Sequence, residues 1–257
     1  KLLDITLDFT ESLINNKPQD IKLEAQCKCT YNGKQMSLGE GDIWGLPRRI
    51  PFRQTFVDVT NSSVCFFGVV TNVINYGNAQ VGAYSNNNQN QQWWIYLLRL
   101  KAGTQGLVEI EEISRNGTQA NFVTLPQDIT PDRIFEIPLL EEDKSTREEM
   151  ISIAAKYWDG CQKGIRPEAV PLHPDARRIE LGSFLTDAQN FQSSVRGAYQ
   201  QPEFYWDVVK RRYPIVDVDR GIVVSIVTML SKHDEFDMPS GYVTDLFKIE
   251  NGLIKYI

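Results

Sequence analysis

Histidine is nearly missing from this 257-residue sequence, which contains only His173 and His233. The motifs of several common enzyme classes are missing too: there is no HExxH pair, no GxSxG segment and no glycine-rich phosphate loop. No CxxC spacing occurs, which makes a zinc site improbable. These absences argue against a metalloprotease, an α/β-hydrolase or a nucleotide-binding enzyme. We therefore predict no metal site and no cofactor.

A long apolar run and an excess of positive charge are also lacking. The longest apolar stretch, residues 221–230, is much shorter than the ~20 residues that cross a bilayer. The net charge is −6, whereas a nucleic-acid surface needs a basic face. We predict no membrane span and no nucleic-acid partner.

Cysteine is scarce, with four residues: Cys27, Cys29, Cys65 and Cys161. They are interpreted either as buried free thiols or as including one disulfide from the 27–29 strand to Cys65. Asn61 and Asn116 begin N-glycosylation sequons at expected turns, so both are predicted glycan sites. The first residue is Lys1 rather than Met. Together these features predict a protein of the secretory pathway or the extracellular space, with its signal peptide removed.

What the sequence does contain is an internal duplication. Residues 97–113 and 246–257 share one pattern, in which an apolar strand, a turn with glycine and a second apolar strand follow each other. We predict a first repeat over 1–121, a proline-rich linker over 122–143 and a second repeat over 144–257. The expected fold class is α+β, with helices packed on one face of curved, mostly antiparallel sheets.

Local patterns place the elements of these repeats. Residues 2–14 have the apolar stripe of an amphipathic helix, and a capping box at Ser145 or Thr146 starts a second one. Residues 75–92 are rich in Asn, Gln and Gly and predict a mobile loop. The strand at 93–101 is apolar on both faces, so we expect it to be covered on both sides.

Four blocks of the sequence resemble a known family: LGEGDIWG (38–45), FFGVV (66–70), RRYPIVDVDRGIVVSIV (211–227) and LFKIENGLIKYI (246–257). The family consists of fungal secretory two-repeat proteins with the NTF2-like, SnoaL-like fold. The resemblance implies two tandem NTF2-like cones. Among such proteins it points to hetero-Diels–Alderases, cofactor-free pericyclases of meroterpenoid secondary metabolism. These join a polyketide tropolone quinone methide to a humulene-type sesquiterpene.

A pericyclase of this kind needs hydrogen-bond donors inside an apolar, aromatic cavity. Our candidate catalytic donors are Tyr96, Arg53, Lys210 and Arg212. Candidate substrate-binding walls are Trp44, Trp93, Trp206 and Tyr213, and the Asn-rich loop is a candidate lid. Each of these residues also has a structural interpretation, because most aromatic residues lie in a core and most cations lie on a solvated face. The expected partners are small hydrophobic substrates.

Two other functions stay open. One is a secreted carrier that binds a hydrophobic metabolite without transforming it. The other is a SnoaL-like isomerase or dehydratase, with His173 and Asp175 as the acid–base pair. His173 has a structural interpretation as well, as a turn residue held by hydrogen bonds. A homodimer is plausible, because sheets of this kind can pair face to face.

Overall fold

The computed structural model describes residues 1–72, 92–116, 133–161, 170–180, 183–184, 206–231 and 241–257. The chain divides into two compact units, Lys1–Pro131 and Asp132–Ile257. The boundary falls within the segment 122–143 that we predicted as a linker. Except for Gln92, the Asn-rich loop lies outside the described residues.

Unit 1 is a six-stranded sheet with one α-helix on its face. Its strands lie in the order β2-β1-β6-β5-β4-β3. All neighbouring strands are antiparallel except β1 and β6, which are parallel. The elements are α1 (Leu2–Asn15), the 3-10 helix η1 (Pro18–Asp20), β1 (Leu23–Tyr31), β2 (Lys34–Gln35), β3 (Arg49–Asp58), β4 (Ser63–Thr71), β5 (Trp93–Ala102) and β6 (Leu107–Asn116).

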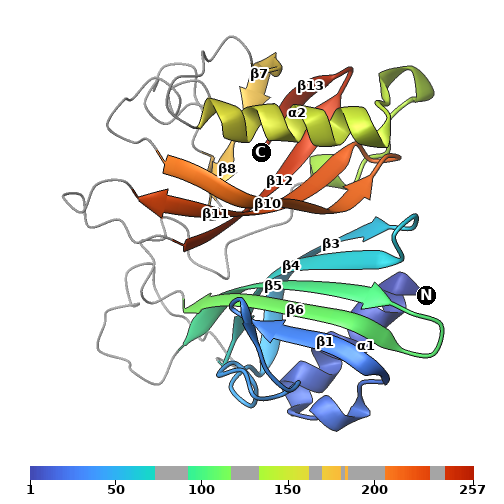
Figure 1. Ribbon diagram of the computed structural model, residues 1–257, viewed down its shortest axis with the longest axis vertical. Helices are drawn as coiled ribbons and strands as arrows, with labels where there is room; N and C mark the ends of the chain where they lie inside the picture. Colours follow the sequence, from blue (N-terminus) through green and yellow to red (C-terminus); the bar gives the residue numbers. More distant parts are fainter. Residues whose placement is uncertain (73–91, 117–132, 162–169, 181–182, 185–205, 232–240) are drawn as a thin grey trace, which may run out of the picture. The chain divides into compact units, whose positions relative to one another are not determined.

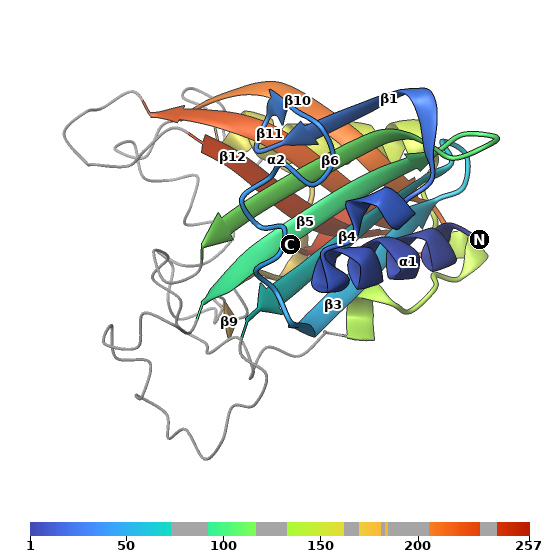
Figure 2. The ribbon, with the colours of Figure 1, turned by 90° about the horizontal axis from the view of Figure 1, so that it is seen from below.

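Helix α1 covers one face of this sheet, as Figure 2 shows. Its apolar stripe buries Phe9 and Leu13, while Leu3 and Leu7 remain about half exposed. The helix ends at Asn16, which has the left-handed conformation (φ 53°) and whose backbone N–H donates to the carbonyl of Leu13. The buried stripe joins the apolar residues of β4, β5 and β6 in one core.

Unit 2 has a five-stranded sheet in the order β10-β11-β12-β13-β7 and a separate two-stranded sheet, β8-β9. Helix α2 packs against the larger sheet (Figure 1). It starts with a capping box between Thr146 and Glu149, one of the two that the sequence predicted. The elements are η4 (Arg133–Phe135), η5 (Glu141–Asp143), α2 (Arg147–Gly160), β7 (Leu172–Arg177), β8 (Ile179–Glu180), β9 (Ser183–Phe184), β10 (Trp206–Asp217), β11 (Ile222–Ser231), β12 (Gly241–Glu250) and β13 (Leu253–Tyr256).

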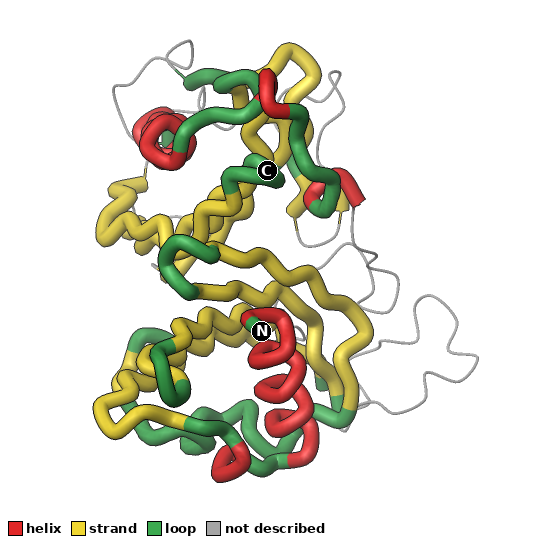
Figure 3. The backbone as a smooth tube through the Cα atoms, turned by 90° about the vertical axis from the view of Figure 1, so that its right-hand side faces the viewer, coloured by secondary structure: helices red, strands yellow, loops and turns green. Residues whose placement is uncertain are grey.

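The two units repeat one topology. In unit 1 the series β1-β6-β5-β4-β3 matches β7-β13-β12-β11-β10 of unit 2, and in each unit the strand after the helix pairs in parallel with the last strand. Figure 3 shows the sheet of unit 1 curving around α1. The duplication in the sequence is thus present in the structure as a repeated strand order.

The predicted fold class, α+β with helices packed on mostly antiparallel sheets in two NTF2-like cones, is wrong. The described residues are mainly β, with two α-helices of 14 residues each. Both large sheets are mixed, because each contains one parallel pair. The resemblance had implied two tandem NTF2-like cones, with helices packed on mostly antiparallel sheets. One helix covers each sheet instead, and strands form the rest of the structure.

The disulfide interpretation is also wrong, because all four cysteines are free. Cys27 and Cys29 lie on β1 with their Sγ atoms 3.9 Å apart, and both face the core beside α1. Cys65 lies on β4, separated from β1 by two intervening strands. At about 4.8 Å between neighbouring strands, that separation is too large for a disulfide.

Candidate functional site

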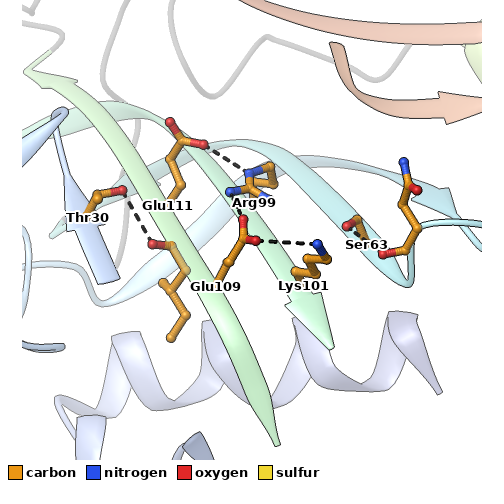
Figure 4. A network of polar contacts seen from close by, with 8 residues as sticks. Thr30, Ser63, Arg99, Lys101, Glu109 and Glu111 are labelled. Carbon is orange, nitrogen blue, oxygen red and sulfur yellow. Dashed lines mark hydrogen bonds and ion pairs between the residues drawn. The ribbon is translucent and has the colours of Figure 1, made fainter. Parts of the chain in front are cut away.

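The sheet of unit 1 has two faces of different chemistry. On β5, the side chains of Trp94, Tyr96, Leu98 and Leu100 join α1 in the core, as their alternation predicted. On the opposite face, Arg99 lies 12% exposed and forms ion pairs with Glu109 (2.7 Å) and Glu111 (3.0 Å) of β6. Figure 4 shows this network, to which Lys101 adds a longer contact with Glu109.

Glu112 lies next to Glu111 in sequence but points to the helix-covered face, where it is 3% exposed. Its carboxylate accepts a hydrogen bond from the Tyr96 hydroxyl (2.6 Å) and from the indole N–H of Trp44 (3.2 and 3.3 Å to its two oxygens). Both donors are neutral. Burial raises the pKa of Glu112 to about 7, although the two hydrogen bonds act in the opposite direction.

Apolar and aromatic side chains enclose this carboxyl group. Trp44 packs edge-on against Phe9 of α1, with ring centroids 5.7 Å apart, and Tyr96 packs similarly against Phe66 at 6.2 Å. Gly68 pairs with Tyr96, and a Cβ atom at Gly68 would lie 2.3 Å from the ring of Phe66. Glycine therefore permits the contact between Phe66 and Tyr96 that closes this side of the site.

Burial and the adjacent Glu112 raise the pKa of Tyr96 well above its usual value. Tyr96 therefore remains a protonated donor at neutral pH. Glu112, in contrast, can exist as either acid or carboxylate near neutrality. This pairing of a fixed donor with a carboxyl group of pKa near 7 is suited to general acid–base chemistry.

A second polar cluster lies beside the first. The Tyr31 hydroxyl donates to the carboxylate of Asp42 and forms a hydrogen bond with the hydroxyl of Ser114. Tyr31 is directly opposite Glu112 across the parallel β1–β6 pair, and Ser114 is opposite Tyr96 across β5–β6. Tyr31 is buried, whereas Asp42 is exposed. This cluster therefore extends from the neighbourhood of Glu112 to the solvent.

Of the predicted site residues in unit 1, the structure brings Tyr96 and Trp44 together at Glu112. Arg53 lies on β3 with its side chain exposed. It pairs with Gly68, which pairs with Tyr96, so Arg53 lies on the same face of the sheet as Tyr96, two strands away. Trp93 is buried on β5, but alternation places it on the face opposite Tyr96. In unit 1, then, Tyr96, Trp44 and Arg53 share the helix-covered face, and Trp93 does not.

The other predicted site residues lie on β10 of unit 2. Lys210 and Arg212 are exposed, and Lys210 has a left-handed φ of 50° at a break in the β10–β11 register. Tyr213 packs against the core of unit 2, where burial raises its pKa. Trp206 begins β10, but its side chain is outside the described part.

His173 and Asp175 lie on β7. The hydrogen bond that joins them runs from the backbone N–H of Asp175 to Nδ1 of His173 (3.1 Å). His173 is thus held by a hydrogen bond, as the structural interpretation expected, but it lies in a strand rather than in a turn. Elsewhere in the described ranges, no three His, Cys, Asp or Glu side chains are grouped as metal ligands. Among these residues there is also no helix long and apolar enough to span a membrane.

Asn61 occupies the turn between β3 and β4, as predicted, and is exposed. The side-chain amide of Asn61 donates to Asp58 (3.2 Å), and the backbone carbonyl of Asn61 accepts from the Ser63 hydroxyl (3.1 Å). Asn116 is the last residue of β6, and the rest of its sequon lies outside the described residues. Glycosylation at both positions stays a prediction, and so does the secretory location.

Glu112, Tyr31, Asp42 and Ser114 are the residues that the sequence reasoning missed. One signal was available for Glu112. Adjacent Glu111 and Glu112 must point to opposite faces of their strand, so one of them shares a face with apolar Val108 and Ile110. The sequence did not show which of the two would meet a cation.

The raised pKa of Glu112 predicts that stability falls as the pH rises. A carboxyl group ordinarily titrates at 4.5, and Glu112 in the folded chain titrates at about 7. The stability that its neutral form provides is fully present below pH 4.5 and is lost as the pH rises through 7, by about 3 kcal/mol. Denaturant-dependent hydrogen exchange in β5 and β6 measures this loss. The difference in unfolding free energy between wild type and Glu112→Gln isolates the contribution of Glu112. If this free energy had the same pH dependence in both proteins, the prediction would be wrong.

A family model described as "Domain of unknown function (DUF8021)" matches residues 143–257. The match covers less than half of the chain and falls in unit 2, whereas Glu112 and its neighbours lie in unit 1. Comparison with curated proteins and with solved structures found no match.

Proposed function

We propose that the protein is a cofactor-independent isomerase that acts on a small, apolar, β,γ-unsaturated ketone in unit 1. The observation that carries this proposal is the position of Glu112, a buried carboxyl group with a pKa of about 7 beside the permanent donor Tyr96. A general base is most effective when its pKa lies near the working pH.

The proposed step moves one proton within the substrate. The carboxylate of Glu112 removes a proton from the carbon next to a carbonyl group, and the electron pair passes to the carbonyl oxygen. The single hydroxyl proton of Tyr96, which points to Glu112 in the free protein, turns to that oxygen, where negative charge develops. Glu112 then returns the proton to a more distant carbon, which shifts the double bond. Glu112 ends the cycle as a carboxylate. Aromatic neighbours such as Trp44 and Phe66 would bind the apolar body of the substrate.

A second candidate is the hetero-Diels–Alder cyclisation of a tropolone quinone methide with a humulene-type alkene. It is favoured by the Tyr96 hydroxyl, a donor set among apolar core residues, because such a donor would stabilise charge on the heterodiene oxygen. In this reaction Glu112 would act as a protonated donor rather than as a base. The two candidates therefore require opposite protonation states of one residue.

The pH dependence of turnover distinguishes them. With a β,γ-unsaturated cyclic ketone, kcat/KM for isomerisation should rise through about pH 7, because the carboxylate of Glu112 is the active form. With the quinone methide and alkene, cyclisation should fall through the same pH. If either compound raises the melting temperature without forming product at any pH, the protein is a carrier and the enzyme proposal is wrong.

A further inference from the structure

Glu112 can change its protonation state only if a proton crosses the protein. Its side chain is enclosed by α1 and the sheet and is 3% exposed. Its two hydrogen-bonding partners, Tyr96 and Trp44, are themselves buried, so neither one delivers a proton from water. Hydrogen-bonded hydroxyl groups are the simplest path, because each can accept a proton on its oxygen while releasing the one it holds.

Tyr31 and Ser114 supply such hydroxyl groups in the right place. Tyr31 is 6% exposed, and its hydroxyl joins the hydroxyl of Ser114 to the carboxylate of Asp42. Asp42 is exposed and lies in the segment between β2 and β3, close to Trp44 in sequence. One end of this chain therefore meets water, while its middle lies inside the core of unit 1.

The inner end of the chain lies beside the Glu112 site, with no direct hydrogen bond between the two clusters in the described structure. Ser114 is two residues after Glu112 on β6, so both side chains point to the same face. Tyr96 pairs with Ser114 and Tyr31 pairs with Glu112, which places the two clusters in adjacent rows of the sheet. The two clusters also interact electrostatically. The pKa of Tyr31 is raised by burial, by the hydrogen bond to Asp42 and, to a lesser degree, by the charges of Asp42 and Glu112.

We propose that Asp42, Tyr31 and Ser114 form a relay that carries protons between solvent and the Glu112–Tyr96 pair. When Glu112 loses its proton, a bridging water molecule carries it to Ser114, which accepts it and passes its own to Tyr31. Tyr31 passes its own proton to Asp42, which releases it to water. Each hydroxyl accepts one proton and gives one, so only Glu112 and the solvent change. The role of the relay in catalysis rests on the proposed function. Proton transfer through the relay does not, so it can be tested without any substrate.

The test is the rate at which Glu112 titrates after a pH jump. Infrared difference spectroscopy follows the carbonyl band of protonated Glu112, which is identified by its loss in Glu112→Gln. In Tyr31→Phe and in Asp42→Asn, we expect titration to slow by about tenfold or more, while its midpoint stays near 7. Asp42→Glu, which keeps a carboxylate at the outer end, should restore most of the rate. Asp20→Asn, which alters another exposed aspartate of unit 1, should titrate like the wild type.

Wild-type rates in both Tyr31→Phe and Asp42→Asn would overturn the relay. Equal slowing in Asp20→Asn would overturn it as well, because the effect would then come from a general loss of surface charge. The proposed function has a separate outcome. If Glu112→Gln turned over substrate like the wild type while the relay variants titrated slowly, the proposed function would be wrong and the relay would stand. Hydrogen exchange in β1 and β6 of each variant establishes that the fold is intact before rates are compared.

Discussion

Replacing Glu112 by glutamine should lower kcat/KM for the unsaturated ketone about 100- to 10,000-fold, the usual contribution of a general acid–base group. The amide can still accept hydrogen bonds from Tyr96 and Trp44, so the side chains around it keep their positions. What it loses is the ability to take up a proton. Steady-state kinetics at about pH 8, where most Glu112 is ionised in the wild type, measures the effect.

Glu109→Gln is the matched control for this substitution. Glu109 lies on the same strand, three residues away, but on the face where it pairs with Arg99 and Lys101. Its loss should reduce stability without changing the rate per folded molecule. Tyr96→Phe should lower kcat/KM about 100- to 1,000-fold, because it removes the donor to the developing oxyanion. If Glu112→Gln and Glu109→Gln turned over substrate equally, Glu112 would not be the base.

Replacing Lys248 by methionine should destabilise unit 2 by about 4 kcal/mol. Lys248 lies on β12, is 1% exposed, and donates from Nζ to the carbonyl oxygens of Ile137 (2.7 Å) and Arg220 (2.5 Å). Methionine has a similar length but no donor. Each carbonyl left without its partner costs about 1–3 kcal/mol, which gives the expected total.

Hydrogen exchange is the suitable measurement, because it resolves the segment that Lys248 holds. Residues 133–143 should exchange faster in Lys248→Met, together with the amides of β12. Lys255→Met is the control, since Lys255 is partly exposed on β13 and pairs with Glu250. It should cost less than about 1 kcal/mol. Similar losses for both lysines would contradict the anchoring role of Lys248.

Much of the fold could be predicted from local patterns. Alternation on the strand at 93–101 correctly separated Tyr96 from Trp93, and the cap at Thr146 correctly marked the start of α2. The repeated pattern at 97–113 and 246–257 corresponds to the last two strands of each unit. These predictions succeeded because strand alternation and helix capping depend on residues close together in the chain.

The fold class and most of the candidate site could not be predicted in this way. The resemblance implied NTF2-like cones with helices packed on mostly antiparallel sheets, and no local pattern indicated that the first strand of each unit pairs in parallel with the last. Four of the eight predicted donors and walls lie on β10 of unit 2, whereas Glu112 lies in unit 1. The aromatic and basic composition of a segment identified candidates without showing which of them meet.

By itself, the sequence determined the two repeats, the position of both helices and the face to which each β5 side chain points. Only the tertiary structure decided that Glu111 meets Arg99 while Glu112 meets neutral Tyr96 and Trp44, and that Lys248 is buried beneath the carbonyl of Ile137. The physical reason is that the environment of a buried charge depends on segments far apart in the chain. Two adjacent glutamates look alike in sequence, and their surroundings alone decide which one has a pKa near 7.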